Sequence, residues 1–382
     1  MTPTADVVVI GGGVIGLAIA WNLTEQQQRI LVVEKHQPGQ EASSAAAGIL
    51  AVSSGRSRQG PVYQLKRASQ ALYPALVEEI EQRSGLSVEY QTAGVLDLLR
   101  TEADEQKYRE IYQLRREQGS AAAWLSAAEV RRLEPHLTTD LRGAVHFPDD
   151  HHLNNGKLAE AWANAVVQRG ATIRTDATVT EARIGNGKVT AVRIGDEWIS
   201  TNTVVIAAGS WSQQVGEVFG LTIPVQPAKG QMMSVRSTLV RHVISWDDHY
   251  LVPRKNGEVV IGSTVEFVGY DKDVSLATLR ALIDRSVVLV PELRSTPLHR
   301  FWAGLRPYSP SRRPILCRAP GLENVILATG HHRNGIVMAP MTGKLIAELI
   351  TTGTPSMSLE PFALPLEPVP PPPEGESPDE AD

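Results

Sequence analysis

The start of the chain combines a strand, a glycine-rich turn and a helix, and this combination constrains the fold more than any other feature. Residues 6–10 read Asp-Val-Val-Val-Ile, a continuous β-branched run typical of a buried parallel strand. Gly11, Gly13 and Gly16 follow with G-x-G-x-x-G spacing. Residues 13–24 have little polar face, as expected for a helix packed on a sheet, and residues 30–34 form a second apolar strand. Together these segments predict a βαβ unit.

Each glycine of this turn has a specific role in binding a dinucleotide. Gly11 permits the tight turn, Gly13 lets the backbone approach a pyrophosphate, and Gly16 lets the helix pack close to the strand. The pyrophosphate would meet the N–H groups at the positive end of the helix, where Val14 and Ile15 stand.

An acidic residue ends the second strand. Glu34, followed by Lys35, stands where a carboxylate accepts hydrogen bonds from ribose hydroxyls and disfavours the 2′-phosphate of NADP. The alternative, a glycine-rich turn that binds nothing, is disfavoured because strand, helix, second strand and acid occur in order. The pattern does not separate FAD from NAD.

Parallel-strand signals lie towards both ends of the chain and antiparallel signals lie between them. Residues 198–206 and 324–329 read as buried strands, and Asn256-Gly257 marks a hairpin turn within an alternating region. We therefore expect an α/β fold, α+β overall, in which a Rossmann-like domain carries an inserted mixed, largely antiparallel sheet. Helices are expected over 63–83, 101–117, 158–169, 275–289 and 342–350, and none over the small-residue stretch 36–60.

The same signals predict the domain boundaries. The dinucleotide domain is expected to comprise residues 1–85, 145–225 and 310–360, and the substrate domain residues 86–144 and 226–309. Residues 361–382 are rich in proline and hold six acidic and no basic residues, which predicts a disordered tail.

The composition of the chain gives no sign of binding to nucleic acid, to a membrane or to a metal ion. The net charge is −5, and the acidic tail accounts for it, so nothing indicates binding to nucleic acid or to an anionic membrane. The single cysteine, Cys317, excludes an internal disulfide and a multi-cysteine metal site and fits a reducing, cytoplasmic location. The N-terminus lacks the basic segment of a signal peptide. The pairs His151-His152 and His331-His332 lack a third ligand at suitable spacing, so we expect no metal.

A second glycine pattern lies near the other end of the chain. It reads Gly-His-His-Arg-Asn-Gly-Ile over residues 330–336, after Gly-Leu-Arg-Pro over residues 304–307. A small-residue run, Gln-Glu-Ala-Ser-Ser-Ala-Ala-Ala-Gly-Ile-Leu, occupies residues 40–50. With the first turn, these motifs make about residues 5–355 resemble the FAD-dependent D-amino acid oxidase superfamily, and within it the glycine oxidases of thiamin biosynthesis.

The resemblance implies FAD and a carboxylate-binding arginine at Arg306. Cys317 lies in an apolar run typical of a small buried residue, so we expect the FAD to be bound non-covalently. The resemblance also places Arg333 over the substrate and flavin and adds Tyr250 to the carboxylate site. A guanidinium suits this task because its planar, permanently charged fork bonds both carboxylate oxygens. The expected cofactor-binding residues are Gly11, Gly13, Val14, Ile15, Gly16, Glu34, Lys35, Ser43, Ser44, Ala47, Gly48, Ile49, Val179, Gly209, His331, His332, Arg333, Asn334, Gly335, Ile336 and Val337.

The chain departs from the family pattern at two places. Residues 150–155 read Asp-His-His-Leu-Asn-Asn where relatives usually have an aspartate-proline pair, and His332 stands where relatives often have tyrosine.

The resemblance implies oxidation of glycine and small amines such as sarcosine to an imine or glyoxylate, ammonia and hydrogen peroxide. The imine would supply thiazole synthesis, with oxygen as co-substrate, thiazole synthase as a partner and a homo-oligomeric (tetrameric) enzyme. The alternatives are a D-amino acid oxidase or dehydrogenase of broader specificity, and a non-catalytic FAD-binding protein.

Overall fold

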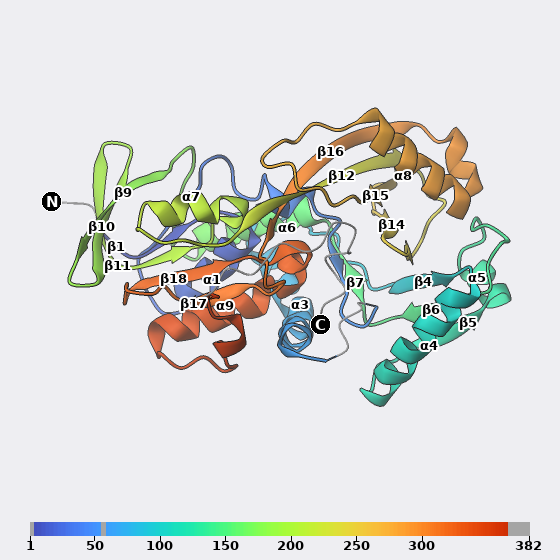
Figure 1. Cartoon of the computed structure of the whole chain (residues 1–382), viewed down its shortest axis with the longest axis horizontal. Helices are drawn as coiled ribbons and strands as arrows, with labels where there is room; N and C mark the ends of the chain where they lie inside the picture. The colour runs from blue at the N-terminus through green and yellow to red at the C-terminus, as the bar shows by residue number, and fades with distance from the viewer. Residues whose placement is uncertain (1–3, 55–58, 366–382) are drawn as a thin grey trace.

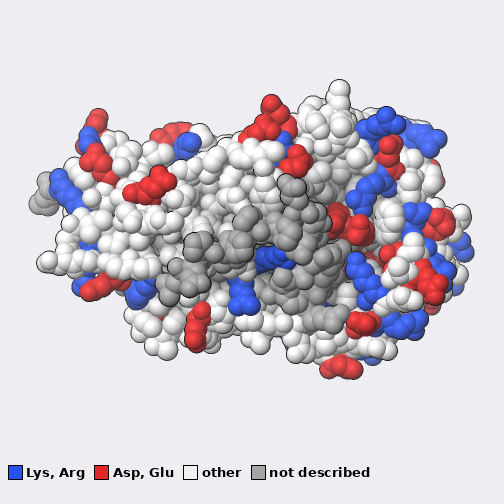
Figure 2. All heavy atoms as spheres, in the orientation of Figure 1, with Lys and Arg blue, Asp and Glu red and all other residues white. Residues whose placement is uncertain are grey.

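The computed structural model of the chain describes residues 4–54 and 59–365. Two large sheets succeed one another along the long axis of the molecule (Figure 1). On the face shown in Figure 2, Lys and Arg are interspersed with Asp and Glu, and these side chains crowd towards the end that holds α4, α5 and α8. No helix within the described ranges is long and apolar enough to cross a membrane.

The first sheet contains five parallel strands in the order β18-β11-β1-β2-β8. The central strand β1 has its side chains buried on both faces, because Val7 and Val9 enter one apolar core and Val8 and Ile10 enter another. This explains why the strand signals were continuous apolar runs. The strands are β1 (Thr4–Ile10), β2 (Ile30–Val33), β8 (Thr172–Arg174), β11 (Glu197–Ile206) and β18 (Val325–Thr329), extended by the antiparallel β17 (Ile315–Arg318), β9 (Val179–Gly185) and β10 (Lys188–Ile194).

Helices cover one face of this sheet. They are α1 (Val14–Thr24), α3 (Pro61–Ser84), α6 (Asn155–Gln168) and α9 (Gly335–Thr351), whose apolar residues join Val7 and Val9 in one core. The opposite face is covered in part by α7 (Ser212–Glu217) and the β9–β10 hairpin.

The second sheet has the order β16-β12-β15-β14-β13-β4-β6-β5 and is antiparallel except where β13 pairs with β4. Its strands are β4 (Val95–Leu99), β5 (Ala123–Ser126), β6 (Gly143–Phe147), β12 (Gln226–Arg236), β13 (Val243–Trp246), β14 (His249–Pro253), β15 (Glu258–Gly262) and β16 (Leu298–Tyr308). The helices α4 (Glu102–Glu117), α5 (Ala127–Leu133) and α8 (Leu276–Leu289) accompany it, and α8 is followed by the 3-10 turn η2 (Pro291–Ser295). The expected α/β fold with a mixed, largely antiparallel second sheet is thus confirmed, whereas the domain boundaries stay a prediction.

The last long helix begins earlier than the sequence indicated. It was expected over residues 342–350, but α9 starts at Gly335 and runs through Pro340. Proline lacks the N–H that would bond the carbonyl four residues earlier, which is that of Ile336. The Tyr73 hydroxyl, from α3, donates to this carbonyl instead. A tertiary contact therefore satisfies the backbone group that proline leaves without a partner.

Two other expectations are corrected. Residues 36–60 were expected to lack a helix, yet they contain the four-residue helix α2 (Ala42–Ala45), followed by β3 (Ile49–Leu50), which pairs with β7 (His151–His152). The tail was expected to begin at residue 361, but η4 (Glu360–Phe362) places the Phe362 ring in the core with only 1% exposure. One aromatic side chain thus anchors the chain beyond the expected boundary, and residues 366–382 lie outside the described ranges.

Replacing Phe362 with alanine is expected to lower the free energy of unfolding by about 3–5 kcal/mol, because a buried aromatic ring is lost and a cavity remains. Chemical denaturation measures this. Phe301→Ala is the matched control, since Phe301 is 53% exposed. Equal stabilities of the two variants would contradict the anchoring role of Phe362.

Candidate active site

A cavity of about 470 Å³ opens at the carboxyl ends of the parallel strands and reaches the second sheet. Its walls include Ile10, Val33 and Ala207, which end or follow β1, β2 and β11, together with Met232, on β12 of the other sheet. Ligands of open parallel sheets bind at this edge, so the position agrees with the dinucleotide motif.

The first glycine turn has no room for a side chain at Gly11 or Gly16. A Cβ atom on Gly16 would lie 1.9 Å from the Gly11 carbonyl oxygen. Gly11 has φ of +113°, and a Cβ there would lie 2.4 Å from the Ala207 oxygen. The strand β1 and the helix α1 therefore approach as closely as the motif requires. At the start of α1, the Val14 N–H donates to Ser43 Oγ at 3.0 Å, which links this turn to the small-residue loop.

Glu34 is held in a defined orientation on the cavity wall. Its carboxylate accepts hydrogen bonds from the Gly12 N–H at 2.7 Å and the His36 N–H at 2.9 Å. These bonds come from the two segments that flank the adenosine side of such sites. The acidic group that the sequence predicted to contact a ribose therefore faces the cavity.

The second glycine pattern turns the chain from β18 into α9. Gly330 has φ of +76°, His331 is buried and hydrogen-bonded to Thr342 Oγ1 at 3.2 Å, and η3 (His332–Asn334) precedes the helix. Burial lowers the pKa of His331 to about 3, so its imidazole is neutral. The positive end of α9, at Gly335 and Ile336, opens on the cavity. It can stabilise negative charge on a bound group.

Arg306 projects from β16 to the cavity and is held by two acceptors. Its Nη1 donates to the Thr264 carbonyl at 2.9 Å and its Nη2 donates to Ser263 Oγ at 2.8 Å. A Cβ on Gly230 would lie 2.2 Å from the guanidinium, so the absence of a side chain on β12 makes room for it. Gly230 was not among the residues expected from the sequence. A single glycine inside a strand often marks a place where another group approaches the backbone closely, and this was the signal that could have identified it.

Tyr250 stands on a neighbouring strand and also depends on a glycine. It pairs in register with Gly262, where a Cβ would lie 2.7 Å from the tyrosine hydroxyl. The hydroxyl lies 3.9 Å from Met232 Sδ. Gly304 serves the same purpose for the small-residue loop, since a Cβ there would lie 2.4 Å from Ala45 Cβ. Three strand glycines thus determine the shape of this end of the cavity.

His332, a residue of the cavity wall, carries a buried polar atom. Its ring packs edge-on against Tyr308 at 5.2 Å, and its Nε2 has no hydrogen-bond partner within the described part of the chain. Burial, with the nearby Arg333, Arg306 and Arg312 guanidinium groups, holds the pKa of His332 well below its usual range. A buried nitrogen without a hydrogen-bond partner carries a desolvation cost.

Most residues that the sequence singled out meet at this cavity. Those on its walls are Gly11, Gly13, Val14, Ile15, Glu34, Lys35, Ser43, Ala47, Gly48, Ile49, Val179, Gly209, Tyr250, Arg306, His331, His332, Arg333, Gly335 and Ile336. Gly16, Ser44, Asn334 and Val337 are not wall residues. Gly16 acts through helix packing, and Val337 is buried within α9. Direct contact with a cofactor remains a prediction for all the residues that the sequence singled out, on the wall or not.

Several wall residues were not expected from the sequence. Trp211, Gln214, Val215 and Val218 follow the expected Gly209 on η1 (Gly209–Trp211), α7 and the residue after it. Ser263 follows β15. Cys317 lies half-buried on β17, where burial raises its pKa, and is not a wall residue. Within residues 4–54 and 59–365, no three His, Cys, Asp or Glu residues are placed to share a metal ion.

Three structural observations indicate that the cavity can hold FAD. Two helix N-termini, those of α1 and α9, open on it, which suits a pyrophosphate at one end and an electron-rich ring at the other. Gly11 and Gly16 allow the close backbone approach, and the wall residue His332 has a buried Nε2 without a hydrogen-bond partner among the described residues. The α1 terminus and the glycine turn also suit NAD, and the α9 terminus and Arg306 line the same cavity.

Known proteins agree with this description. Residues 6–349 match the family model described as FAD dependent oxidoreductase (DAO). The glycine oxidase of Geobacillus kaustophilus is 33% identical, with 95% of this chain and 97% of the relative aligned. Its crystal structure superposes with a TM-score of 0.91 over 96% of this chain and all of the relative. The bifunctional protein ThiO/ThiG of Synechocystis is 35% identical over 92% of this chain, which spans about half (52%) of that relative.

The cavity geometry, the family match and the structural superposition point to the same cofactor and the same type of chemistry. The expected FAD is thereby supported over NAD. The chain belongs to the DAO family of FAD-dependent oxidoreductases.

Proposed function

We propose that this enzyme oxidises glycine and small amines such as sarcosine, with oxygen as the electron acceptor. The observation that carries the proposal is the Arg306 guanidinium, held by Ser263 and Thr264 at the second-sheet end of the cavity. A permanently charged planar fork in that position suits an amino acid carboxylate. Relatives named glycine oxidase support the choice of substrate.

The side chains of this protein would position the substrate and provide the electrostatic environment of the reaction. Bound FAD supplies the redox chemistry by accepting a hydride from the substrate Cα. Arg306 would bind the carboxylate and so direct the Cα towards the cofactor side of the cavity. Tyr250 and Met232, 3.9 Å apart, stand on the wall and favour a substrate with a small side chain. The neutral His332 adds no positive charge that would repel the substrate amine.

We also propose that the imine product supplies thiazole synthesis. Its support is the relative named bifunctional protein ThiO/ThiG, in which a region similar to this chain makes up about half of the protein. A separate thiazole synthase would then be a partner, and a homo-oligomer is the expected assembly. Co-elution of purified thiazole synthase with this enzyme, with light scattering to give the mass, tests both.

Anaerobic mixing with glycine or sarcosine is expected to bleach the flavin absorbance near 450 nm faster than mixing with bulky D-amino acids such as D-phenylalanine. The physical reason is that Tyr250 and Met232, 3.9 Å apart on the cavity wall, would obstruct a bulky side chain. Stopped-flow absorbance measures the rates, and admission of oxygen should restore the colour and yield hydrogen peroxide. Bleaching by D-phenylalanine but not by glycine would instead favour the D-amino acid oxidase alternative. A flavin that no amine reduces would favour a non-catalytic FAD-binding protein.

A further inference from the structure

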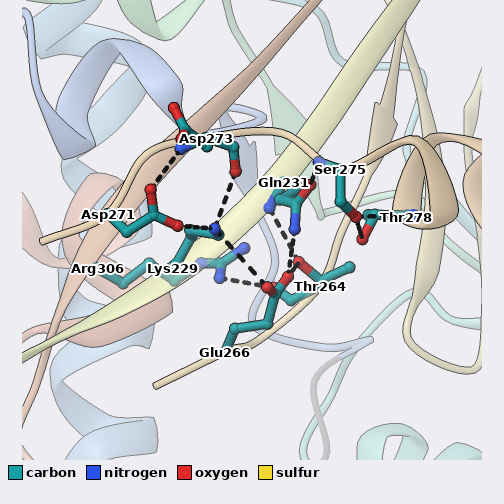
Figure 3. Close-up of polar contacts among 9 residues, drawn as sticks. All are labelled: Lys229, Gln231, Thr264, Glu266, Asp271, Asp273, Ser275, Thr278 and Arg306. Atoms are coloured by element: carbon teal, nitrogen blue, oxygen red, sulfur yellow. Dashed lines mark hydrogen bonds and ion pairs between the residues drawn. The ribbon is translucent and has the colours of Figure 1, made fainter. Parts of the chain in front are cut away.

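A buried lysine lies at the centre of a cluster of polar residues beside Arg306 (Figure 3). The polar cluster consists of Lys229, Gln231, Thr264, Glu266, Asp271, Asp273 and Ser275. Lys229, on β12, is only 4% exposed. Its ammonium lies 2.6 Å from Asp271 Oδ2 and 3.9 Å from Glu266 Oε2, and it donates to the Asp273 carbonyl at 2.9 Å. Burying an ammonium is costly unless it is paired, and a pair of this kind is a better organiser of local structure than a source of stability. Neither the family motifs nor the cavity walls include Lys229.

The cluster fastens the 263–275 segment, which connects β15 to α8, against β12. Lys229 and Glu266 exchange backbone hydrogen bonds of 2.8 and 2.9 Å. The Gln231 N–H donates to Thr264 Oγ1 at 3.0 Å, and its side-chain amide donates to Glu266 Oε1 at 2.7 Å. The Ser275 N–H donates to the Gln231 amide oxygen at 2.8 Å. Alternate residues of one strand therefore hold both ends of the segment.

The first two residues of this segment are the acceptors for Arg306. Ser263 Oγ and the Thr264 carbonyl receive the two guanidinium bonds, while Gly230, between Lys229 and Gln231 on β12, provides the space beneath the guanidinium. The direction of the Arg306 fork thus depends on where the 263–275 segment is held (Figure 3).

Tyr270 and Lys272 of the segment contact other residues of the cavity wall. The Tyr270 hydroxyl donates to the Ser210 carbonyl at 2.8 Å, and its ring lies 5.6 Å from that of Trp211. The Lys272 ammonium lies 3.0 Å from a Glu41 carboxylate oxygen. Ser210, Trp211 and Glu41 are all cavity-wall residues, so one segment contacts both Arg306 and three other residues of the wall.

We propose that Lys229 is a positioning residue for Arg306, acting through the 263–275 segment. The inference rests on the proposed function in one respect, namely that Arg306 receives the substrate carboxylate. Lys229 touches neither substrate nor cofactor in this account. Its ammonium fixes Asp271 and Asp273, the bridge to Glu266 fixes Thr264, and Thr264 and Ser263 fix the guanidinium.

Lys229→Met removes the charge while keeping an unbranched side chain of similar length in the buried position. The acidic partners can be hydrated when the ammonium is absent, because the Asp271 side chain is 44% exposed and that of Glu266 is 32% exposed. The segment should therefore loosen without collapse of the core. Arg306 would then sample more orientations, and a carboxylate would bind more weakly because less of its site is preorganised.

The test compares Lys229→Met with Lys188→Met, a matched control whose ammonium pairs with Glu323 at 3.0 Å on a 57% exposed side chain of β10. Glycolate, which is glycine with a hydroxyl in place of the amine, serves as a binding probe by titration of the flavin absorbance of the holoenzyme. Lys229→Met should raise the glycolate Kd and the glycine KM about tenfold with kcat within about twofold and FAD content unchanged. The control should match the wild type.

A double-mutant cycle with Arg306→Ala decides whether the effect passes through Arg306. The Lys229→Met effect on glycolate affinity should fall to about twofold or less when Arg306 is already absent. A tenfold effect in both backgrounds, or unchanged affinity in folded, FAD-loaded Lys229→Met, would overturn the inference while leaving the proposed function intact. If the wild type neither binds glycolate nor is reduced by glycine, the proposed function fails and takes this inference with it.

Asp271→Asn is the second variant, for the case that Lys229→Met does not fold. It keeps the ammonium and weakens its shortest ion pair, of 2.6 Å, at a half-exposed position. The same shift in KM relative to kcat is expected at smaller size, about threefold. Wild-type KM and glycolate Kd in a folded Asp271→Asn holoenzyme would contradict the positioning role.

Discussion

The Arg306→Ala enzyme is expected to oxidise glycine with kcat/KM lowered by roughly 10- to 150-fold, while it still binds FAD. The physical reason is the loss of a charge-assisted bond to the carboxylate, which contributes about 1.5–3 kcal/mol. The effect can exceed this range because the guanidinium is held in place by Thr264 and Ser263 at 2.9 and 2.8 Å and so needs little further ordering. Steady-state peroxide production and anaerobic flavin reduction measure it.

Two further variants show what the charge and the fork contribute separately. Arg306→Lys keeps the charge but cannot bond both carboxylate oxygens in a plane, so its kcat/KM should fall between those of the wild type and Arg306→Ala. Arg280→Ala is the matched control, because Arg280 is 85% exposed on α8. An unchanged KM and kcat/KM for glycine in Arg306→Ala would remove Arg306 from the substrate site and leave the proposed function without its main support.

Gly16→Ala is expected to yield a protein that is nearly colourless as purified, with FAD affinity lowered by about 100-fold. The added Cβ would lie 1.9 Å from the Gly11 carbonyl oxygen, a backbone atom that no side-chain rotation can move away. Helix α1 must then shift from β1, which displaces the N-terminal end of the helix from the pyrophosphate position. Titration of the apoprotein with FAD, followed by quenching of flavin fluorescence, gives the affinity.

Gly185→Ala controls for the change of glycine to alanine itself. Gly185, at the end of β9, has a negative-φ backbone and nothing within 4 Å of an added Cβ, so the variant should bind FAD as the wild type does. Circular dichroism of both apoproteins separates loss of cofactor from loss of fold. A Gly16→Ala protein with one flavin per chain and wild-type FAD affinity would contradict this prediction. It would show that α1 can move away from β1 without weakening FAD binding.

Local segments of the chain could be predicted because their determinants are neighbours in the sequence. The strand β1, the turn at Gly11 and the helix α1 were expected within one or two residues, since steric needs of a glycine turn and the apolar pattern of a buried strand are local. Where a tertiary contact replaced a local one, the prediction was wrong. Tyr73 compensates for Pro340 in α9, and Phe362 anchors residues beyond the expected tail boundary.

The substrate end of the cavity was predicted in part. Arg306, Arg333 and Tyr250 were identified through a family resemblance, and all three lie on the cavity wall. Gly230, Gly262 and Ser263, which shape the surroundings of Arg306 and Tyr250, were not identified. Their importance depends on strand register, since Tyr250 faces Gly262 and β12 lies beside β16 only in the folded sheet. A one-residue change of register would move these side chains to the opposite face.

The sequence by itself therefore indicated a dinucleotide site at the end of a parallel sheet, because the glycine turn and the carboxylate that identify such a site lie in one continuous βαβ segment. The tertiary structure alone decided how a carboxylate site is assembled beside it. Arg306, its acceptors at 263 and 264, and the buried Lys229 come from three segments far apart in the sequence. Their contacts arise from strand pairing and from burial of a charge that only partners brought together by folding can offset.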